Sequence, residues 1–382
     1  MWRAVILGCI LVCAWRAAQA SSYSEFNAGI AAHNRGDWDE TIKDDDAALA
    51  APDLLPGFRV PAHIDRGDAY AAKQQWSPAE ADYAAVLQAK PENLEARILR
   101  AAVFREEKRY DAAIADFTQV IKIRPTLPMG YEGRAITYDE QGNLDAAIAD
   151  YTTVIGFEPR EPAFYVLRGS AWRRKGGFDM AIADQSKALE LDGSLSRALF
   201  ERAEAYMDKG DYDSAVSDSA QGVRLKPADL DGRMELGRAQ WSAGQFSDAE
   251  TTFAQLVTAR PAFAYTAIWH ALALAAEGKD YAQSFAGETA SADKTKWPAP
   301  IVQLYLGQST PAAVLAAAAD PDAEKNKEQL CEANFYGGEW QLQHGQEAAA
   351  RPMLAAAQQS CPLEFIERDA ASAELARLGR RH

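Results

Sequence analysis

The sequence predicts an all-α fold, a superhelical solenoid of antiparallel helix hairpins with a helical C-terminal cap. Residues 111–125 read DAAIADFTQVIKIRP and residues 145–159 read DAAIADYTTVIGFEP, so nearly the same helix recurs after 34 residues. Aligned on this period, residues 60–263 form six contiguous units without an insertion. A repeat of this length is typical of units that bury their apolar faces only by stacking on one another.

Residues 1–20, MWRAVILGCILVCAWRAAQA, read as a secretory signal peptide. A positive charge precedes a short apolar stretch, and Ala18-Gln19-Ala20 is a small-x-small cleavage site. The stretch is too short for a stable membrane span, and Cys9 and Cys13 lack the context of a lipidation site. We expect cleavage, no transmembrane segment afterwards and a periplasmic protein without lipid; an uncleaved membrane anchor is the alternative.

The charge balance bears on the class of partner. Loss of Arg3 and Arg16 with residues 1–20 changes the formal net charge from −15 to −17. Such an acidic chain is a poor ligand for nucleic-acid phosphates or anionic lipid surfaces. We therefore expect no nucleic acid among the partners, and we interpret most charges, including Asp44-Asp45-Asp46, as solvated helix faces.

Small residues recur at two positions of every unit. Position 8 is Gly67, Ala101, Ala135, Gly169, Ala203 and Gly237, and position 20 is Ala79, Ala113, Ala147, Ala181, Ala215 and Ala249. Small side chains let two helices approach closely, and an aromatic residue at position 11 of five units fills the volume beside that contact. Proline or glycine at position 32 ends the second helix. Each unit is therefore predicted to be a helix–turn–helix hairpin.

This pattern resembles the tetratricopeptide repeat, which has small and aromatic residues at this spacing. A degenerate copy over residues 21–59 precedes the six units, and another over residues 264–296 follows them. The first helix of each unit, helix A, is expected to line the inner wall of a curved array, and the second, helix B, the outer wall.

Arginine and aspartate recur together. Position 7 is Arg66, Arg100, Arg134, Arg168 and Arg202, and position 23 is Asp44, Asp82, Asp116, Asp150, Asp184 and Asp218. In the last unit both change together, to Leu236 and Thr252, which favours ion pairs inside the scaffold over a series of arginines for an acidic ligand. Pairing within a unit and pairing to the preceding unit are both compatible with the sequence.

Positions 2, 5, 9 and 12 share one face of helix A and are the candidate partner-binding surface. Its apolar members are Ile64, Ile98, Met129, Ile136, Val166, Phe200, Met207, Met234 and Trp241, and its polar members are Asp68, Arg105, Glu132, Asp139, Arg173, Glu204 and Arg238. Apolar side chains on a wall that faces water favour an extended peptide or a partner helix as ligand. Coverage by neighbouring helices is the alternative. On the binding hypothesis, glutamate at Met234 and Trp241 abolishes capture without unfolding the chain.

Residues 297–382 form a C-terminal module in which the period is lost and one hairpin, residues 331–362, regains it. Cys331 and Cys361 take positions 1 and 31 of that hairpin, at its open end, so we predict a disulfide; two free thiols are the alternative. A last helix near Leu363–Leu378 is expected to cap the array.

The segments WPAPIVQLYLG, CEANFYGGEW and AELARL look like the C-terminal portion of NlpI-type proteins, which are bacterial envelope tetratricopeptide proteins. The resemblance covers Trp297 to Leu378. It implies a non-enzymatic periplasmic adaptor that recruits peptidoglycan hydrolases or a protease and can form a homodimer. Those proteins are usually lipoproteins with a shorter array, so their partners do not carry over to this chain.

No residue pattern in the chain indicates catalysis. The histidines, His33, His63, His270, His344 and His382, include no pair at metal-ligand spacing, and no phosphate-binding loop or hydrolase motif occurs. We expect no cofactor, no metal and no enzymatic activity. The leading hypothesis is a scaffold that binds other proteins; the alternatives are a structural component of an envelope polysaccharide or secretion assembly, and a hydrolase with an unrecognised site.

Overall fold

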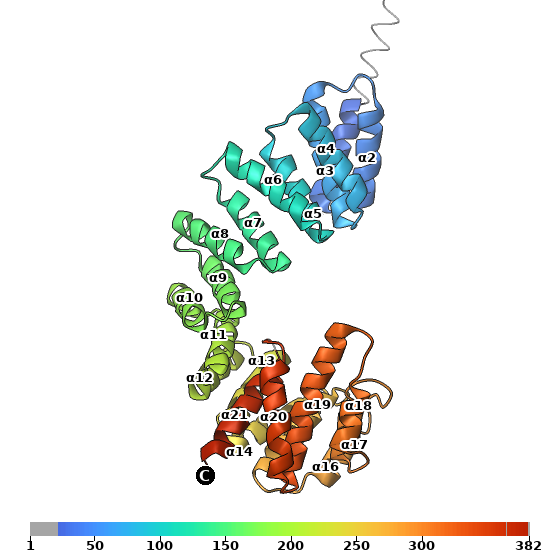
Figure 1. The fold of residues 1–382 in the computed structure, drawn as a ribbon. Coiled ribbons are helices and arrows are strands. Elements are labelled where there is room, and N and C mark those ends of the chain that lie inside the picture. Colours follow the sequence, from blue (N-terminus) through green and yellow to red (C-terminus); the bar gives the residue numbers. More distant parts are fainter. Residues whose placement is uncertain (1–21, 364, 381–382) are drawn as a thin grey trace, which may run out of the picture. The chain divides into compact units, whose positions relative to one another are not determined.

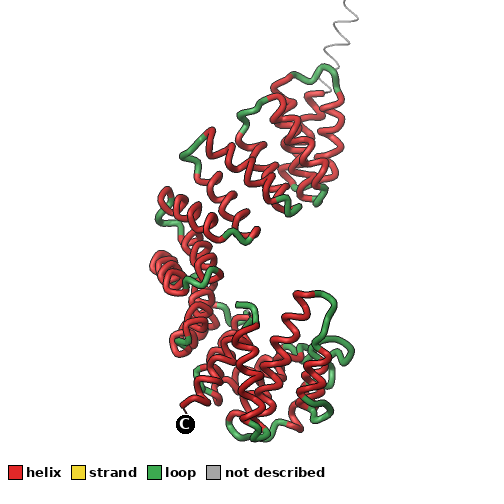
Figure 2. Tube along the Cα trace, viewed as in Figure 1, coloured by secondary structure: helices red, strands yellow, loops and turns green. Residues whose placement is uncertain are grey.

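The computed structural model describes residues 22–363 and 365–380; the predicted signal peptide lies outside this range. Within it the chain is helical and contains no β-strand (Figure 2). Consecutive helices pack against one another in pairs along the chain (Figure 1). The all-α solenoid predicted from the 34-residue period is confirmed.

The helices fall into two compact units, Met1–Pro159 and Arg160–His382, a division that cuts the six repeats after the third. In the first unit a helix over residues 22–35 is followed by α2 (Trp38–Ala50), α3 (Pro56–Ala72), α4 (Trp76–Ala89), α5 (Leu94–Glu106), α6 (Tyr110–Ile123), α7 (Pro128–Gln141) and α8 (Leu144–Phe157). In the second unit the remaining repeats are α9 (Pro162–Arg174), α10 (Phe178–Leu191), α11 (Ser196–Lys209), α12 (Tyr212–Leu225), α13 (Leu230–Ser242) and α14 (Phe246–Ala259).

The second unit continues with α15 (Ala264–Ala276), the short helices α16 (Ala282–Glu288), α17 (Ala299–Tyr305) and α18 (Pro311–Ala317), and then α19 (Ala323–Gln343), α20 (Glu347–Ser360) and α21 (Ile366–Arg380). Helices α17 and α18 occupy the part of the C-terminal module where the period is lost, and α19 and α20 form the predicted last hairpin.

The predicted period fixes where the helices begin. Helices α5, α7, α9, α11 and α13 all start at the first position of their repeats. Gly142 and Gly210 follow α7 and α11 with φ of 84° and 77°, a left-handed conformation that glycine adopts without steric cost. The first repeat differs, because Pro56–Arg59, which precede its first position, form the first turn of α3.

Close helix contact requires the small residues at position 8. A Cβ atom on Gly67 would lie 2.7 Å from the Tyr83 ring, and one on Gly237 would lie 2.7 Å from the Phe253 ring. Both rings are buried and stand at position 24 of the same repeat. In these repeats an aromatic ring of helix B therefore packs directly against a glycine of helix A, which lets the two helices approach closely.

Phe200 makes the same kind of contact both within its own repeat and with the following repeat. Its ring lies where Cβ atoms on Gly222 and Gly232 would stand, at 2.6 and 2.3 Å. The ring therefore packs into the space between α12 and α13. Phe200, predicted to present its side chain to a ligand, is largely a packing residue.

The arginine–aspartate series forms ion pairs inside each of the first five repeats. Every arginine bonds the aspartate 16 residues later through Nε, at 2.9, 2.8, 2.7, 2.8 and 2.6 Å for Arg66–Asp82, Arg100–Asp116, Arg134–Asp150, Arg168–Asp184 and Arg202–Asp218. We call these five pairs the ladder. Pairing within a unit is thus the correct alternative, and Asp44 stands outside the ladder.

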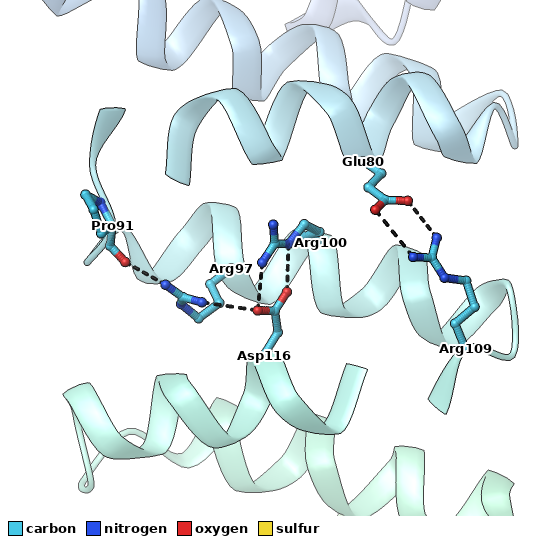
Figure 3. Close-up of polar contacts among 6 residues, drawn as sticks. All are labelled: Glu80, Pro91, Arg97, Arg100, Arg109 and Asp116. Carbon is cyan, nitrogen blue, oxygen red and sulfur yellow. Dashed lines mark hydrogen bonds and ion pairs between the residues drawn. The ribbon is translucent and has the colours of Figure 1, made fainter. Parts of the chain in front are cut away.

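The ladder also connects repeats. Arg134 donates from Nη1 to the Thr118 hydroxyl at 3.1 Å, and Arg202 donates to Ser186 at 2.9 Å, in each case on the preceding B helix. At Asp116 a second arginine, Arg97, also reaches the carboxylate and bonds the Pro91 carbonyl (Figure 3). Nearby, Arg109 pairs with Glu80 across adjacent repeats (Figure 3).

The largest core lies in the second unit. Trp241, Phe253, Trp269, Phe335 and Tyr336 are buried together there, so the C-terminal helices and the last repeats share one core. The predicted disulfide is present, with an S–S distance of 2.02 Å between Cys331 and Cys361, and joins the start of the hairpin to its end.

Asp45 contradicts the interpretation of residues 44–46 as a solvated face. It is fully buried at the position where other repeats carry Tyr83 or Phe117, and neither carboxylate oxygen has a hydrogen-bond partner among the described residues. Burial, aided by the nearby Asp65, raises the pKa of Asp45 to about 8.

We predict that Gly232→Ala destabilises the chain by about 1–3 kcal/mol, because the new methyl group would overlap the Phe200 ring. Gly156→Ala is the matched control: it is also helical, has nothing within 4 Å of its Cβ position, and should stabilise by about 0.5–1 kcal/mol. Thermal unfolding of both variants checks this; equal midpoints would contradict the contact.

Removal of one partner of a ladder pair should destabilise the chain more than replacement of both partners by apolar residues. Arg134→Met leaves Asp150, which is 6% exposed, without its partner, at a cost of about 2–4 kcal/mol. The double variant Arg134→Met/Asp150→Leu should be less destabilised than the single one. Urea unfolding compares the two, and a double variant at least as unstable as Arg134→Met argues against a paired role.

Candidate interaction surface

The inner-wall residues of the first unit lie on α3, α5 and α7 with graded exposure. Met129 is 51% exposed, Ile98 and Ile136 are half-buried, and Ile64 is 8% exposed in the core with Tyr83. Met129 is therefore the predicted apolar anchor that is most accessible, whereas Ile64 acts mainly as a core residue.

The polar inner-wall residues of the first unit are mostly acidic. Asp68 accepts a hydrogen bond from the Tyr83 hydroxyl at 2.6 Å, and burial raises its pKa. The pKa of Glu132 is raised by burial and by Glu158. Arg105 makes ion pairs with Glu106 and Glu140, and Asp139 is half-buried. Because the basic residue is already paired, the wall presents net negative charge beside its apolar side chains.

In the second unit the inner wall is covered by the chain's own last helix. Helix α21 packs against α13, α19 and α20 (Figure 1). Arg173, Glu204, Met207 and Arg238, four predicted binding residues from α9, α11 and α13, line a narrow cavity together with Asp369 of α21. The surface predicted to hold a partner helix thus holds a helix of this chain.

Arg377 holds the C-terminal half of α21 against α13. Its guanidinium lies 4.5 Å from the centre of the Trp241 ring and donates to the Ser242 carbonyl at 3.0 Å. It also donates to Glu374 at 2.8 Å, one turn earlier on α21. Cation–π contact and charge-assisted hydrogen bonds therefore hold this end of the helix.

Charged groups hold the N-terminal half of α21. Arg173 bonds Asp208 at 2.6 Å and also pairs with Glu204, while Arg368 of α21 lies 3.5 Å from the other Asp208 oxygen. Asp369 lies beside this group and is 8% exposed. Burial, with Asp208 nearby, raises the pKa of Asp369 to about 7.

The two predicted anchors on α13 are core residues. Trp241 is 1% exposed between Trp269 and Phe335, and Met234 is 7% exposed in the same cluster. Val166 is also buried, at 5%. The expectation that glutamate at Met234 and Trp241 spares the fold is therefore wrong, because it would place two charges in the main core.

Other kinds of site find no support in the part of the chain that the structure describes. No group of three histidine, cysteine, aspartate or glutamate residues there could hold a metal ion. No helix over residues 22–363 or 365–380 combines the length and the apolar character that a bilayer span requires.

Family models of the tetratricopeptide repeat match residues 64–128, 133–196 and 206–275, about half of the chain. The chain is a tetratricopeptide repeat protein. Proteins of this family are generally non-enzymatic scaffolds that bind other proteins or peptides, and the repeats of this chain form an interaction scaffold of the same fold. No curated protein matches the sequence.

Solved structures with similar folds are distant in sequence. A MamA protein is 22% identical with a TM-score of 0.42, covering 45% of this chain and 93% of its own. A tetratricopeptide repeat protein from Parabacteroides merdae is 17% identical with a TM-score of 0.49, covering 65% and 98%. YrrB, described as having an unusual peptide-binding site, is 12% identical with a TM-score of 0.41, covering 49% and 95%.

The buried carboxyl of Asp369 should make the second unit less stable as the pH rises. Its pKa is higher in the folded chain than its ordinary 3.8, so folding favours the protonated form. The stabilisation is complete below about pH 4 and is lost by about pH 7, a change on the order of 2–4 kcal/mol. Asp369→Asn should flatten this dependence in thermal unfolding between pH 4 and 8; an unchanged slope would contradict it.

Proposed function

We propose that this protein is a periplasmic adaptor that binds a helical or extended segment of a partner protein along the inner faces of its A helices. The observation that carries the proposal is α21, which lies against α13 and lines a cavity with Arg173, Glu204 and Arg238. The inner wall of the second unit accommodates a helix, so a wall of the same construction is suited to bind one from another protein.

The inner wall of the first unit is the proposed site. Met129 is exposed and Ile98 and Ile136 are accessible in part, whereas the corresponding face of α13 is covered. Acidic neighbours such as Asp68 and Glu132 add negative charge to this wall. A segment with apolar side chains and lysine or arginine beside them is the complementary ligand.

Export of the protein is part of the proposal. Its support is the signal-like composition of residues 1–20 and the Cys331–Cys361 disulfide, since structural disulfides persist in oxidising compartments. The resemblance of residues 297–378 to NlpI-type proteins suggests a class of partner, peptidoglycan hydrolases or a protease, without fixing which member is bound, and a homodimer as one state of the adaptor.

Two exposed methionines allow a matched test of the inner wall. Met129 on the inner face of α7 and Met180 on helix B of the fourth repeat are 51% and 49% exposed, so glutamate at either site should leave the fold intact. Met129→Glu should weaken partner binding about tenfold or more, because it places a charge against the apolar part of the ligand. Met180→Glu should leave binding unchanged.

Affinity capture from a periplasmic extract with wild type and both variants provides the measurement, followed by a binding titration with each partner recovered. Partners lost only with Met129→Glu identify the ligand of the inner wall. Partners retained equally by both variants, or lost only with Met180→Glu, would move the interaction to another surface.

A further inference from the structure

A cavity of about 300 Å³ lies in the second unit among α13, α15, α19 and the start of α21. Much of its wall is aromatic, from Phe263, Tyr265, Trp269 and Phe365. Phe263 is 43% exposed, whereas Trp269 is 1% exposed. The cavity is at the lower end of the volume range of small-ligand sites, which are typically apolar with a few placed polar groups.

Glu332 is the polar group of the cavity that has one carboxyl oxygen without a hydrogen-bond donor among the described residues. Its Oε2 accepts from the Tyr265 hydroxyl at 2.7 Å and from the Trp297 indole nitrogen at 2.8 Å. Among the described residues no donor binds Oε1, although the side chain is only 9% exposed and lines the cavity. Two donors thus fix the carboxyl group while one acceptor stays available.

Glu367 and Arg238 are the other charged groups of the cavity. Burial raises the pKa of Glu367, while the Tyr336 hydroxyl, which donates to it at 2.8 Å, and the nearby Arg238 favour its charged form. No cation among the described residues forms an ion pair with Glu332, and the charged neighbours that raise its pKa, Glu367 and Glu328, are both acidic. A buried carboxylate without a counter-charge is unfavourable, so the cavity favours a cationic ligand at Glu332.

We propose that this cavity binds an alkylammonium group, with Glu332 Oε1 accepting its N–H bond and the aromatic rings contacting its methylene carbons. Rings beside a carboxylate suit an organic cation, because their faces attract the charge and their bodies cover the alkyl chain. The group could come from a free amine or from a lysine side chain of a bound partner.

Binding is coupled to release of a proton. Burial and the neighbouring Glu367 raise the pKa of Glu332 to about 8, so the carboxyl group of the empty cavity is mostly protonated at pH 7. An ammonium ion stays charged at this pH and favours the carboxylate. Up to one proton is therefore released per ligand, and the affinity rises as the pH approaches 8.

The test is calorimetric titration of the full chain with n-butylammonium at pH 7, in two buffers of different ionisation enthalpy. Wild type should bind with proton release. Glu332→Gln keeps the size of the side chain and an oxygen for Tyr265 and Trp297 but cannot ionise, so its affinity should fall about ten- to a hundredfold. Glu339→Gln is the control, because Glu339 is a buried acid on the same helix outside this cavity and should bind as wild type does.

Phe263→Ala, at the exposed ring, is a second variant that does not affect the buried acids and should weaken binding several-fold. Absence of binding by wild type, or equal binding by wild type and Glu332→Gln, overturns the proposal.

A capped lysine, N-acetyl-lysine methylamide, distinguishes the two sources of the ammonium group. Tighter binding than butylammonium assigns the site to a partner's lysine, and weaker binding assigns it to a free amine. The amine titration needs no partner, so its result is independent of the adaptor proposal.

Discussion

The constraint on which the structure depends is that a two-helix repeat cannot bury its apolar surface alone. Each hairpin packs tightly inside itself, as Tyr83 on Gly67 and Phe253 on Gly237 illustrate, and leaves a second face for its neighbour. An array therefore needs a different solution at its end. In the second unit α17, α19 and α21 provide it, placing Phe335, Tyr336 and Leu378 in one core with Trp241 and Trp269 of the last repeats.

The ladder adds specificity to this stacking. Its arginines are bonded to aspartates that are 3–6% exposed, and some also bond a hydroxyl group of the preceding repeat. Buried, paired charges contribute little net stability, but a change of register would leave them unpaired at high cost. Because these arginines are occupied inside the scaffold, they are not a docking site for acidic ligands, and the proposed recognition relies on the other positions of the A helices.

Much of the fold could be predicted from the sequence because the 34-residue period results from contacts that recur within each repeat and between neighbouring repeats. Helix starts from α5 to α13, the disulfide and the final hairpin all follow from it. The period could not reveal that Trp241 is covered, since Arg377 and Phe335 approach it from far along the chain. The predictions for Phe200 and Asp45 were wrong for a related reason. The helical period shows which residues share a face, but it does not show that a glycine on a neighbouring helix leaves room for a side chain to pack inward, as Gly232 does for Phe200 and Gly29 for Asp45.

The contacts of α21 explain why the inner walls of the two units differ in accessibility. The helix joins the core through Ala370, Ala371 and Leu378, yet its contact with the inner wall is charged, through Arg368 near Asp208, the buried Asp369, and Arg377 on Trp241. A partner at this wall would have to replace both the ion pairs and the core contacts of a helix tethered to the same chain, which is present at high effective concentration. At the first unit's wall no such competitor is present among the described residues, so that wall stays accessible, as the proposed site requires. The same repeat chemistry thus yields a self-occupied wall in one unit and an accessible one in the other.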